Sequence, residues 1–488
     1  MEDWPFGLHN GGAGRVWSVV AVRVLASREE GTTMVEKKRF VVTFVEEGVP
    51  KAAAAKMLGV ARSRVAEGLG VLESAADYDP KKVLNFQEIG AAVATLSEKD
   101  AEDLRGAEGV AEVVEDFEVY ALGSDRSVES GAAGYTPPVL HPEAYWADEA
   151  GRRMGAQDQT EAGALADCPP GHRKVCFKLA PWFPPLCFCL PVGPPPEPDQ
   201  PIPWNIEMVG AERVWRRVTG AGVKVAVLDT GIDENHPDLT VSGGISMVPG
   251  VTSWDDDQGH GTHCAGIIGA RNNPSGVVGV APNSKLYAVK VLNDRGTGYL
   301  SWILAGMGWA EQNGMDVVSM SLGSNVDKPD APCTLAYQRA AERLNSAGCI
   351  TVAAAGNNGR DPVNPWVGNP ARCAGFMAVA AVDRNKNLAA FSSRGPASLC
   401  SDCGVEIAAP GVSINSTTRG GGYGLKSGTS MACPHVSGAA ALLKELHPTW
   451  TPGKIRDRLR ATADDLGAPG NDPSFGSGLL NCHRAVYG

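Results

Sequence analysis

GTSMACPHVSGAAALLKEL, residues 428–446, is the stretch around which the rest of the chain is organised. Gly428 allows close approach of another backbone, and Pro434 suits the first turn of a helix, where its missing N–H is not needed. The residues that follow have helical character, so we expect a helix whose positive N-terminal field includes Ser430. A serine hydroxyl is a weak nucleophile at neutral pH. Chemistry at Ser430 therefore requires a nearby base and a third group that orients the base.

Two candidates for these groups lie upstream. Asp229 ends the apolar run VKVAVLD (223–229), and a carboxylate that follows buried apolar residues needs a hydrogen-bonding partner. His260 lies in DDQGHGTHCAGIIGA (256–270), where the flanking glycines leave room for its ring to face a cleft. Taken singly, an aspartate at a strand end is more often a cap, and a lone histidine is more often a buried core residue. Together with the serine segment, the three strings predict nucleophilic catalysis.

From Pro201 onward the sequence alternates short, almost wholly apolar segments with amphipathic ones. The apolar segments are typical of strands that helices cover on both faces: 223–229, 284–292, 315–323, 349–357, 376–383 and 405–411. The amphipathic segments predict helices at 299–314, 334–348 and 451–465, the last with Thr451 as N-cap. This alternation predicts an α/β fold with a mostly parallel sheet and helices on both faces, in which chemistry gathers at the carboxyl ends of the strands.

Residues 38–122 predict a smaller unit of another class. We expect a strand over 38–46, a helix over 52–69, a strand pair within 84–96, a helix that Ser97 caps, and a last strand over 110–122. Asp100, three residues after Ser97, completes the capping signal. The order β-α-β-β-α-β predicts a small ferredoxin-like α+β domain before the larger one.

Two further segments separate and precede these domains. Residues 123–200 lack periodicity and are rich in proline, so we expect a Pro/Cys-rich linker before the domain of residues 201–488. Its cysteines favour an oxidising compartment, although disulfides, free thiols and a metal site with His172 all remain open: Cys168, Cys176, Cys187 and Cys189. Residues 1–37 are an N-terminal extension or a poor signal segment, and Met34 is an alternative start.

Composition excludes several classes of function. The 488 residues carry a formal net charge of −11, which argues against a nucleic-acid partner. No run of 18 apolar residues occurs, so we expect no membrane span. We expect a monomer that is secreted into an extracellular setting.

Four strings together resemble the active-site signatures of the subtilisin family of serine peptidases, proteinase K-like enzymes included: DTGID (229–233), GHGTHCAG (259–266), AAAGNNG (353–359) and GTSMACPHV (428–436). The resemblance extends from Ile202 to about Val486. It implies a serine endopeptidase in which Ser430 attacks the scissile carbonyl, His260 transfers the proton and Asp229 orients the imidazole. It also implies that Asn357 donates to the oxyanion, beside the Ser430 main-chain N–H.

The same resemblance implies where a protein or peptide substrate binds. The substrate would add as a strand between two edges, Gly296, Thr297, Gly298 on one side and Ser321, Leu322, Gly323 on the other. Ala354, Gly356 and Gly368 would line the pocket for the residue before the cut. Because these residues are small, we expect large apolar or aromatic residues in the pocket and broad tolerance elsewhere.

Calcium is the cofactor that the resemblance implies. The residues that fall on the family's calcium ligands combine carboxylate, amide and main-chain oxygens, as a hard cation prefers: Gln200, Asp238, Asn273, Ser275 and Val277. A plain Asn-Pro turn is the alternative for the loop that begins at Asn273.

Residues 39–122 resemble the inhibitory pro-domain of this family through AAVATLSEKDAEDL (91–104) and VVEDFEVYAL (113–122), although the segment 51–83 is longer and richer in alanine than usual. The resemblance implies a self-processing zymogen whose own pro-domain is an intramolecular inhibitor. Residues 119–122 would then lie in the substrate groove and be cut by Ser430, and a second cut before Gln200 is equally conceivable.

Four further cysteines lie near the predicted active site or in a nearby insertion, and two other functions are possible on the same fold. Cys264 and Cys433 are expected to be packed free thiols, and Cys400 and Cys403 to lie in a surface loop. A catalytically silent binding module on the same fold would have lost part of the set Asp229, His260, Asn357 and Ser430, which is intact. A peptide ligase or transferase, which passes the acyl group to an amine, remains open.

Overall fold

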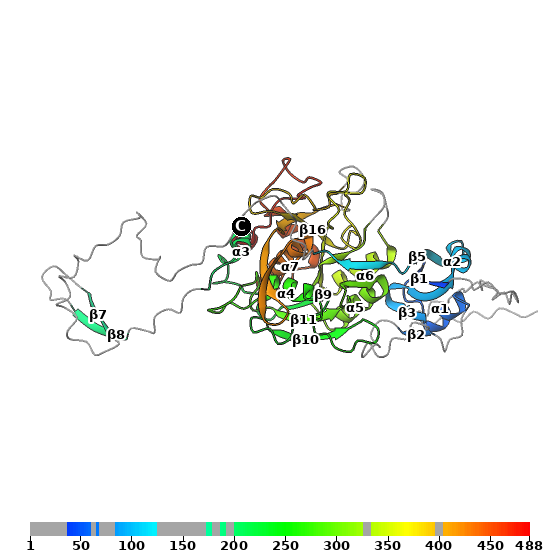
Figure 1. Cartoon of the computed structure of the whole chain (residues 1–488), viewed down its shortest axis with the longest axis horizontal. Coiled ribbons are helices and arrows are strands. Elements are labelled where there is room, and N and C mark those ends of the chain that lie inside the picture. The colour runs from blue at the N-terminus through cyan, green and yellow to red at the C-terminus, as the bar shows by residue number, and fades with distance from the viewer. Residues whose placement is uncertain are drawn as a thin grey trace, which may run out of the picture. The chain divides into compact units, whose positions relative to one another are not determined.

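The computed structural model describes residues 37–59, 65–67, 83–123, 172–177, 186–191, 200–325, 333–395 and 404–488 (Figure 1). The chain forms two compact units, one of Met1–Asp125 with Ile202–Gly488 and the other of Arg126–Pro201. The possible signal segment and Met34 lie outside the described residues. No helix within these ranges is both long enough and apolar enough to cross a membrane.

A seven-stranded parallel sheet forms the centre of the first unit. Its order is β10-β11-β9-β13-β15-β16-β17, and all six predicted strands are present: β9 (Lys224–Asp229), β11 (Lys285–Lys290), β13 (Val317–Met320), β15 (Ile350–Ala354), β16 (Met377–Val382) and β17 (Ile407–Pro410). The predicted α/β fold is thus confirmed. Edge strand β10 (Val241–Ser246) was missed, because its sequence VSGGIS is glycine-bearing and only partly buried.

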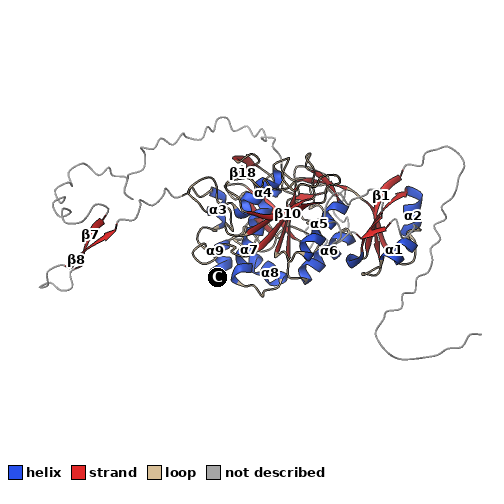
Figure 2. Ribbon diagram, turned by 90° about the horizontal axis from the view of Figure 1, so that it is seen from below, coloured by secondary structure: helices blue, strands red, loops and turns tan. Residues whose placement is uncertain are grey.

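Helices cover both faces of this sheet (Figure 2). On β9, Val225 and Val227 pack in one core, whereas Ala226 and Leu228 pack in the other, as the two-residue period of a strand requires. The first core includes residues of α3 (Trp204–Val209), α4 (His260–Gly269), α7 (Thr429–Leu446), α8 (Pro452–Ala461) and α9 (Cys482–Tyr487). The second includes residues of α5 (Leu300–Gln312) and α6 (Leu335–Ser346).

A smaller five-stranded sheet of order β2-β3-β4-β1-β5 belongs to the same unit. Its elements are β1 (Lys37–Phe44), α1 (Lys51–Met57), β2 (Val65–Glu67), β3 (Val83–Phe86), η3 (Gln87–Ile89), β4 (Ala91–Ser97), α2 (Glu98–Arg105) and β5 (Val110–Glu115). The Ser97 hydroxyl accepts from the Asp100 N–H, and the Asp100 carboxylate accepts from the Ser97 N–H, so the capping box is present as expected.

Two expectations for this smaller sheet were wrong. The helix over 52–69 ends at Met57, because Gly59 adopts a left-handed conformation with φ of 63° and β2 follows. The last strand over 110–122 is broken after Glu115. Its second half, β6 (Glu118–Ala121), leaves the smaller sheet and pairs with β12 (Thr297–Tyr299) and β14 (Leu322–Gly323).

One disulfide is present among the described residues. Cys333, just before α6, forms a disulfide with Cys373, with 5.0 Å between the two Cα atoms. Since these cysteines are 40 residues apart and follow no recognisable spacing, the sequence did not predict the bridge. Cys264 and Cys433 are buried free thiols, as predicted, and so are Cys349 and Cys482.

In the second unit, the described residues form an antiparallel hairpin of β7 (His172–Phe177) and β8 (Leu186–Pro191), in a segment expected to lack strands. Pro181, Pro184 and Pro185 lie between the two strands in the sequence, and they made the whole segment look like a loop. Only the backbone of Cys176, Cys187 and Cys189 is described, so the open alternatives for this cysteine cluster stay open. Cys168, Cys400 and Cys403 lie outside the described residues.

Candidate active site

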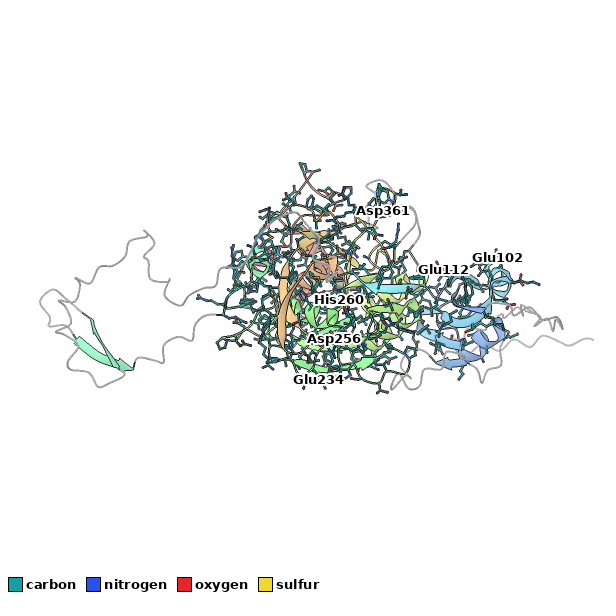
Figure 3. The ribbon with its side chains drawn as sticks, in the orientation of Figure 1. Glu102, Glu112, Glu234, Asp256, His260 and Asp361 are labelled. Atoms are coloured by element: carbon teal, nitrogen blue, oxygen red, sulfur yellow. A yellow bond between two sulfur atoms is a disulfide. The ribbon has the colours of Figure 1, made fainter. Side chains whose placement is uncertain are left out.

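Asp229 and His260 lie at the ends of two adjacent elements. Asp229 closes β9, and His260 begins α4, with Gly259 as N-cap at φ of 101°. The His260 Nδ1 atom lies 2.7 Å from Asp229 Oδ1, and both side chains are almost fully buried. The Thr230 N–H also donates to Asp229 Oδ1, at 2.7 Å. The structure therefore brings the predicted base and its orienting carboxylate into direct contact. His260 is labelled in Figure 3.

The turn before His260 is held by Asp256, a residue that the sequence analysis did not single out. One Asp256 oxygen accepts from Thr230 Oγ1 and from the N–H groups of Gln258 and Gly259, at 2.7–3.0 Å. The other accepts from the N–H and hydroxyl of Thr262, at 2.9 and 2.6 Å. A carboxylate that accepts five hydrogen bonds fixes the start of α4, and with it the place of the imidazole. In the sequence, the acidic string DDQ (256–258) just before Gly259 and His260 could have pointed to Asp256.

The protonation of His260 is set by two opposing effects. Burial alone would lower the pKa of His260, but the Asp229 carboxylate raises this pKa well above its ordinary value of 6.5. Among the described residues, no group hydrogen-bonds to His260 Nε2. The Ser430 hydroxyl instead donates to the Ser321 carbonyl at 2.8 Å. The contact through which His260 would take the serine proton is thus not formed in this arrangement.

Ser430 lies in the first turn of α7, but Pro434 does not. The helix begins at Thr429 with Gly428 as N-cap, so Pro434 is its sixth residue, and the expectation of a first-turn proline was wrong. An internal proline leaves the carbonyl four residues earlier without its helical donor. Here that carbonyl belongs to Ser430, and it accepts instead from Ser321 Oγ at 2.8 Å and Cys264 Sγ at 3.5 Å. The helix therefore continues because side chains of other elements replace the missing donor.

Asn357 follows β15, and two hydrogen bonds orient its side chain. Its Oδ1 atom accepts from the N–H and the hydroxyl of Thr429, each at 3.0 Å. The other end of the amide, Nδ2, therefore points into the site and donates to the Leu122 carbonyl oxygen at 2.5 Å. A Cβ on Gly428 would lie 2.2 Å from the same oxygen, so only glycine leaves space for it there. Asn357 and the start of α7 thus surround one carbonyl oxygen.

The Leu122 carbonyl directly follows β6, which lies between the two predicted substrate edges. Thr297 and Gly298 of β12 pair with Tyr120 and Val119. On the other side, Leu322 and Gly323 of β14 pair with Ala121 and Tyr120. The N–H groups of Ala121 and Leu122 extend the pairing to the carbonyls of Gly296 and Ser321, at 2.9 and 3.2 Å. All six predicted edge residues therefore lie beside residues 118–122.

The Leu122 side chain is 6% exposed and lies in a pocket. The three predicted lining residues, Ala354, Gly356 and Gly368, are among those around it, together with Gly323, Asn369 and Ser393. Beyond Leu122, a Cβ on Gly123 would lie 2.8 Å from both Cδ2 and Nε2 of His260. The Leu122–Gly123 peptide bond is therefore flanked by Asn357 on one side and His260 on the other.

Four of the five predicted calcium ligands gather in one place. Asp238 Oδ1 accepts from Asn273 Nδ2 at 2.7 Å, and Oδ2 accepts from the Val277 N–H at 3.0 Å. The Asn273 Oδ1 atom accepts from the Ser275 N–H at 2.9 Å. A Cβ on Gly276, whose φ is 73°, would lie 2.4 Å from Asp238 Oδ2, so the loop wraps closely around the carboxylate. Gln200 belongs to the second compact unit, and its part in the site stays a prediction.

Comparison with known proteins agrees with this geometry. The model of the Subtilase family matches residues 220–478. Over 289 residues, 59% of this chain and 72% of the relative, the chain is 46% identical to Subtilisin E of Bacillus subtilis strain 168. It is 48% identical over 288 residues to Subtilisin Savinase of Lederbergia lenta, of which 99% is covered. It is also 48% identical over 288 residues to an alkaline protease of Alkalihalobacillus alcalophilus, of which 70% is covered.

Proposed function

Because this chain belongs to the subtilase family and is a subtilisin-like serine endopeptidase, we propose that it is made as a zymogen which cuts itself between Leu122 and Gly123. In this proposal residues 38–122 are the inhibitory pro-domain. The observation that carries it is the hydrogen bond from Asn357 to the Leu122 carbonyl, with β6 paired to both groove edges. A chain segment in that place is both an inhibitor and a substrate.

The chemical step follows from the positions of four residues. The Ser430 hydroxyl leaves the Ser321 carbonyl, turns toward His260 Nε2 and loses its proton to it as Oγ attacks the Leu122 carbonyl carbon. The oxyanion that forms is held by Asn357 Nδ2 and the Ser430 N–H, and Asp229 stabilises the charged imidazole. The bond between Leu122 and Gly123 then breaks, the Gly123 amine takes the proton from His260, and water hydrolyses the acyl-enzyme on Ser430.

Substrate choice follows from the groove and the pocket. Pairing with β12 and β14 uses main-chain groups, which every peptide offers, so we propose broad specificity toward protein substrates. The pocket around Leu122 is lined mostly by small residues, Ala354, Gly356 and Gly368 among them, and Trp366 adds an aromatic ring to the lining. It therefore favours a large apolar or aromatic residue before the cut.

The pro-domain is held by more than its last strand. The Asp116 carboxylate accepts hydrogen bonds from the N–H and the hydroxyl of Ser301, at 2.9 and 2.8 Å, and Ser301 lies in the first turn of α5. The Glu112 carboxylate accepts from the N–H of Leu335, the first residue of α6, at 2.9 Å. Helix N-termini carry unpaired N–H groups and partial positive charge, so carboxylates stabilise them. Two acidic side chains of residues 110–116 therefore dock the smaller sheet onto α5 and α6.

We also propose a structural calcium ion at Asp238. The donor set combines the Asp238 carboxylate, the Asn273 side-chain oxygen and main-chain carbonyls of Ser275 and Val277, which suits a hard cation, and the loop around Gly276 closes on the carboxylate. The ion would tie this loop to the chain at Asp238 and so stabilise the fold, with no part in the chemical step.

We propose that the protein is secreted and works outside the cell. The Cys333–Cys373 disulfide supports it, because disulfides persist in oxidising surroundings and are rare in the cytosol.

The deciding experiment is intact-mass analysis with N-terminal sequencing of the full chain beside Ser430→Ala, both with calcium. We expect the wild type to yield a new N-terminus at Gly123, or within the linker after further trimming, and Ser430→Ala to stay whole. Cleavage of Ser430→Ala at the same bond would show that Ser430 does not carry out the cut. A wild-type chain that also stays whole would refute self-processing.

A further inference from the structure

One side chain of the larger domain reaches into the smaller sheet. Arg339, the fifth residue of α6, donates from Nη1 to the carbonyls of Phe44 and Ile89, at 2.8 and 3.0 Å. Its Nη2 donates to the Val45 carbonyl at 3.1 Å. The side chain is 11% exposed, and the half-exposed Glu47 carboxylate lies 3.5 Å from Nε. A guanidinium so largely removed from water requires such acceptors, and all three of them are main-chain atoms of residues 38–122.

These three carbonyls come together only when the smaller sheet is folded. Phe44 and Val45 stand at the end of β1, whereas Ile89 ends η3, just before β4. Antiparallel pairing of β1 with β4 places Thr43 opposite Ala91, and the Phe44 N–H donates to the Gly90 carbonyl at 2.7 Å. An unfolded or extended segment could not present the three acceptors to one planar guanidinium, whose donors are fixed in a fork.

The groove contacts have no such requirement. Residues 118–122 pair with β12 and β14 through main-chain groups that any extended peptide can offer. A substrate strand and the pro-domain tail are therefore alike in the groove. They differ at α5 and α6, where Asp116 and Glu112 bond to the helix N-termini and Arg339 bonds to carbonyls that only the folded sheet brings together.

We propose that Arg339 is a recognition residue by which this peptidase distinguishes its own folded pro-domain from a substrate. The proposal rests on the zymogen function above. Arg339 holds the smaller sheet on α6 after the Leu122–Gly123 bond is cut, so that activity appears only when the cut pro-domain unfolds or leaves. Gly90 is part of the same contact. Its φ is 60°, and a Cβ there would lie 3.1 Å from Arg339 Nη1 and 2.2 Å from the Glu46 carbonyl oxygen.

The chain offers a matched control one helical turn further on. Arg343 lies on the same helix and donates to Glu311 of α5, from Nε at 3.1 Å and from Nη2 at 2.6 Å. Both partners of that pair belong to the larger domain. Arg343→Ala thus removes a guanidinium of α6 with no contribution to the contact at Phe44, Val45 and Ile89.

The test follows maturation of full-length wild type, Arg339→Ala and Arg343→Ala. Intact mass gives the time at which the Leu122–Gly123 bond is cut, and hydrolysis of a chromogenic tetrapeptide that occupies only the groove gives the time at which activity appears. We expect Arg339→Ala to shorten the lag between the two by about tenfold or more, the effect of losing one charge-assisted hydrogen bond. Its kcat/KM after maturation should equal that of the wild type, and Arg343→Ala should keep the wild-type lag.

The possible negative results distinguish failure of the role of Arg339 from failure of the zymogen function on which it rests. If the wild type is cut at Leu122 but the lag of Arg339→Ala is unchanged, this inference fails and the zymogen function stands. If the wild type stays whole, both fail. Should Arg339→Ala not yield folded protein, Arg339→Lys decides, because lysine keeps the charge without the fork: a shortened lag with unchanged mature kcat/KM supports the inference, and a wild-type lag overturns it.

Discussion

The Leu122 carbonyl oxygen accepts a hydrogen bond from the Asn357 side chain at 2.5 Å, although 235 residues separate the two in the sequence. Thr429 orients the Asn357 amide by donating two hydrogen bonds to its other end. Thr429 is the residue before Ser430. The contact therefore brings together the residue after β6, the loop after β15 and the start of α7. The main-chain carbonyl of the proposed cleavage site is thus already held by the group that would stabilise its negative charge.

Replacement of Asn357 should lower turnover and leave substrate binding almost unchanged. A loss in kcat of roughly 100- to 1000-fold is expected for Asn357→Ala, the size known for removal of this donor in a subtilisin. Steady-state kinetics of the matured enzyme on a chromogenic peptide measure it. A rise in KM with unchanged kcat would mean that Asn357 binds ground state and transition state equally, contrary to the proposed role.

Activity should increase with pH as His260 loses its proton. Burial opposes the charged form, but Asp229 raises the pKa of His260 well above 6.5, and only neutral imidazole can accept the serine proton. The ascending limb of kcat/KM should therefore lie above pH 6.5. The stabilising His260–Asp229 ion pair is complete below pH 6.5 and is lost as the pH rises through the raised pKa.

Asp229→Asn is the control for this pH dependence. The substitution removes the negative charge, so the limb should move to lower pH. The kcat should fall by about 10,000-fold, because an asparagine amide that donates to Nδ1 leaves the proton on Nε2, the tautomer that cannot accept the serine proton. An ascending limb at or below pH 6.5 in the wild type would contradict the argument.

Removal of calcium should lower thermal stability without touching the chemical step. At a calcium concentration about 100 times the dissociation constant, binding contributes roughly 2.7 kcal/mol to the free energy of unfolding. Calorimetry of Ser430→Ala, which cannot digest itself, should show a lower Tm with a chelator. Addition of Asp238→Asn should abolish this difference, whereas addition of Asp361→Asn, at an exposed carboxylate of another loop, should preserve it. Equal Tm values with and without chelator would exclude the site.

A mercurial should inactivate the matured enzyme through Cys264. Its thiol lies 3.9 Å from His260 Nδ1, and the candidate ligand atoms of Asp229, His260 and Cys264 all lie within 4.8 Å of one another. Mercury on this sulfur would therefore disturb the imidazole and its carboxylate. Cys264→Ala should retain activity in the mercurial, and Cys349→Ala, which removes another buried thiol, should remain sensitive. Inhibition of Cys264→Ala would refute the assignment.

Loss of the Cys333–Cys373 disulfide should destabilise the fold. For a separation of 40 residues, the chain-entropy relation gives about 3–4 kcal/mol of unfolding free energy. Guanidinium unfolding in the Ser430→Ala background measures it for the double replacement by serine and for each single one. All three variants should lose similar amounts, since each breaks the same bridge. Two single losses that add up in the double variant would show that the thiols act separately.

Much of the fold and of the candidate site follows from local patterns. The six apolar strands, the Ser97 cap and the glycine-flanked strings at Asp229, His260, Asn357 and Ser430 were all visible in the sequence. Strand periodicity, helix caps and tight turns depend on neighbours within a few residues, so short stretches carry enough information to predict them.

Contacts between distant segments depended on the tertiary structure. The Ser430 hydroxyl bonds to Ser321, Arg339 reaches β1 and η3, and Cys333 finds Cys373, yet no local pattern distinguishes these residues from similar ones elsewhere. The predicted position of Pro434 in the first turn of the helix was wrong for the same reason. A proline fits inside α7 because Ser321 and Cys264 donate to the Ser430 carbonyl, which the proline leaves without a helical donor. Local sequence limits the conformation of each segment, but which segments meet is decided by packing of the whole core and by the need of every buried polar group for a partner.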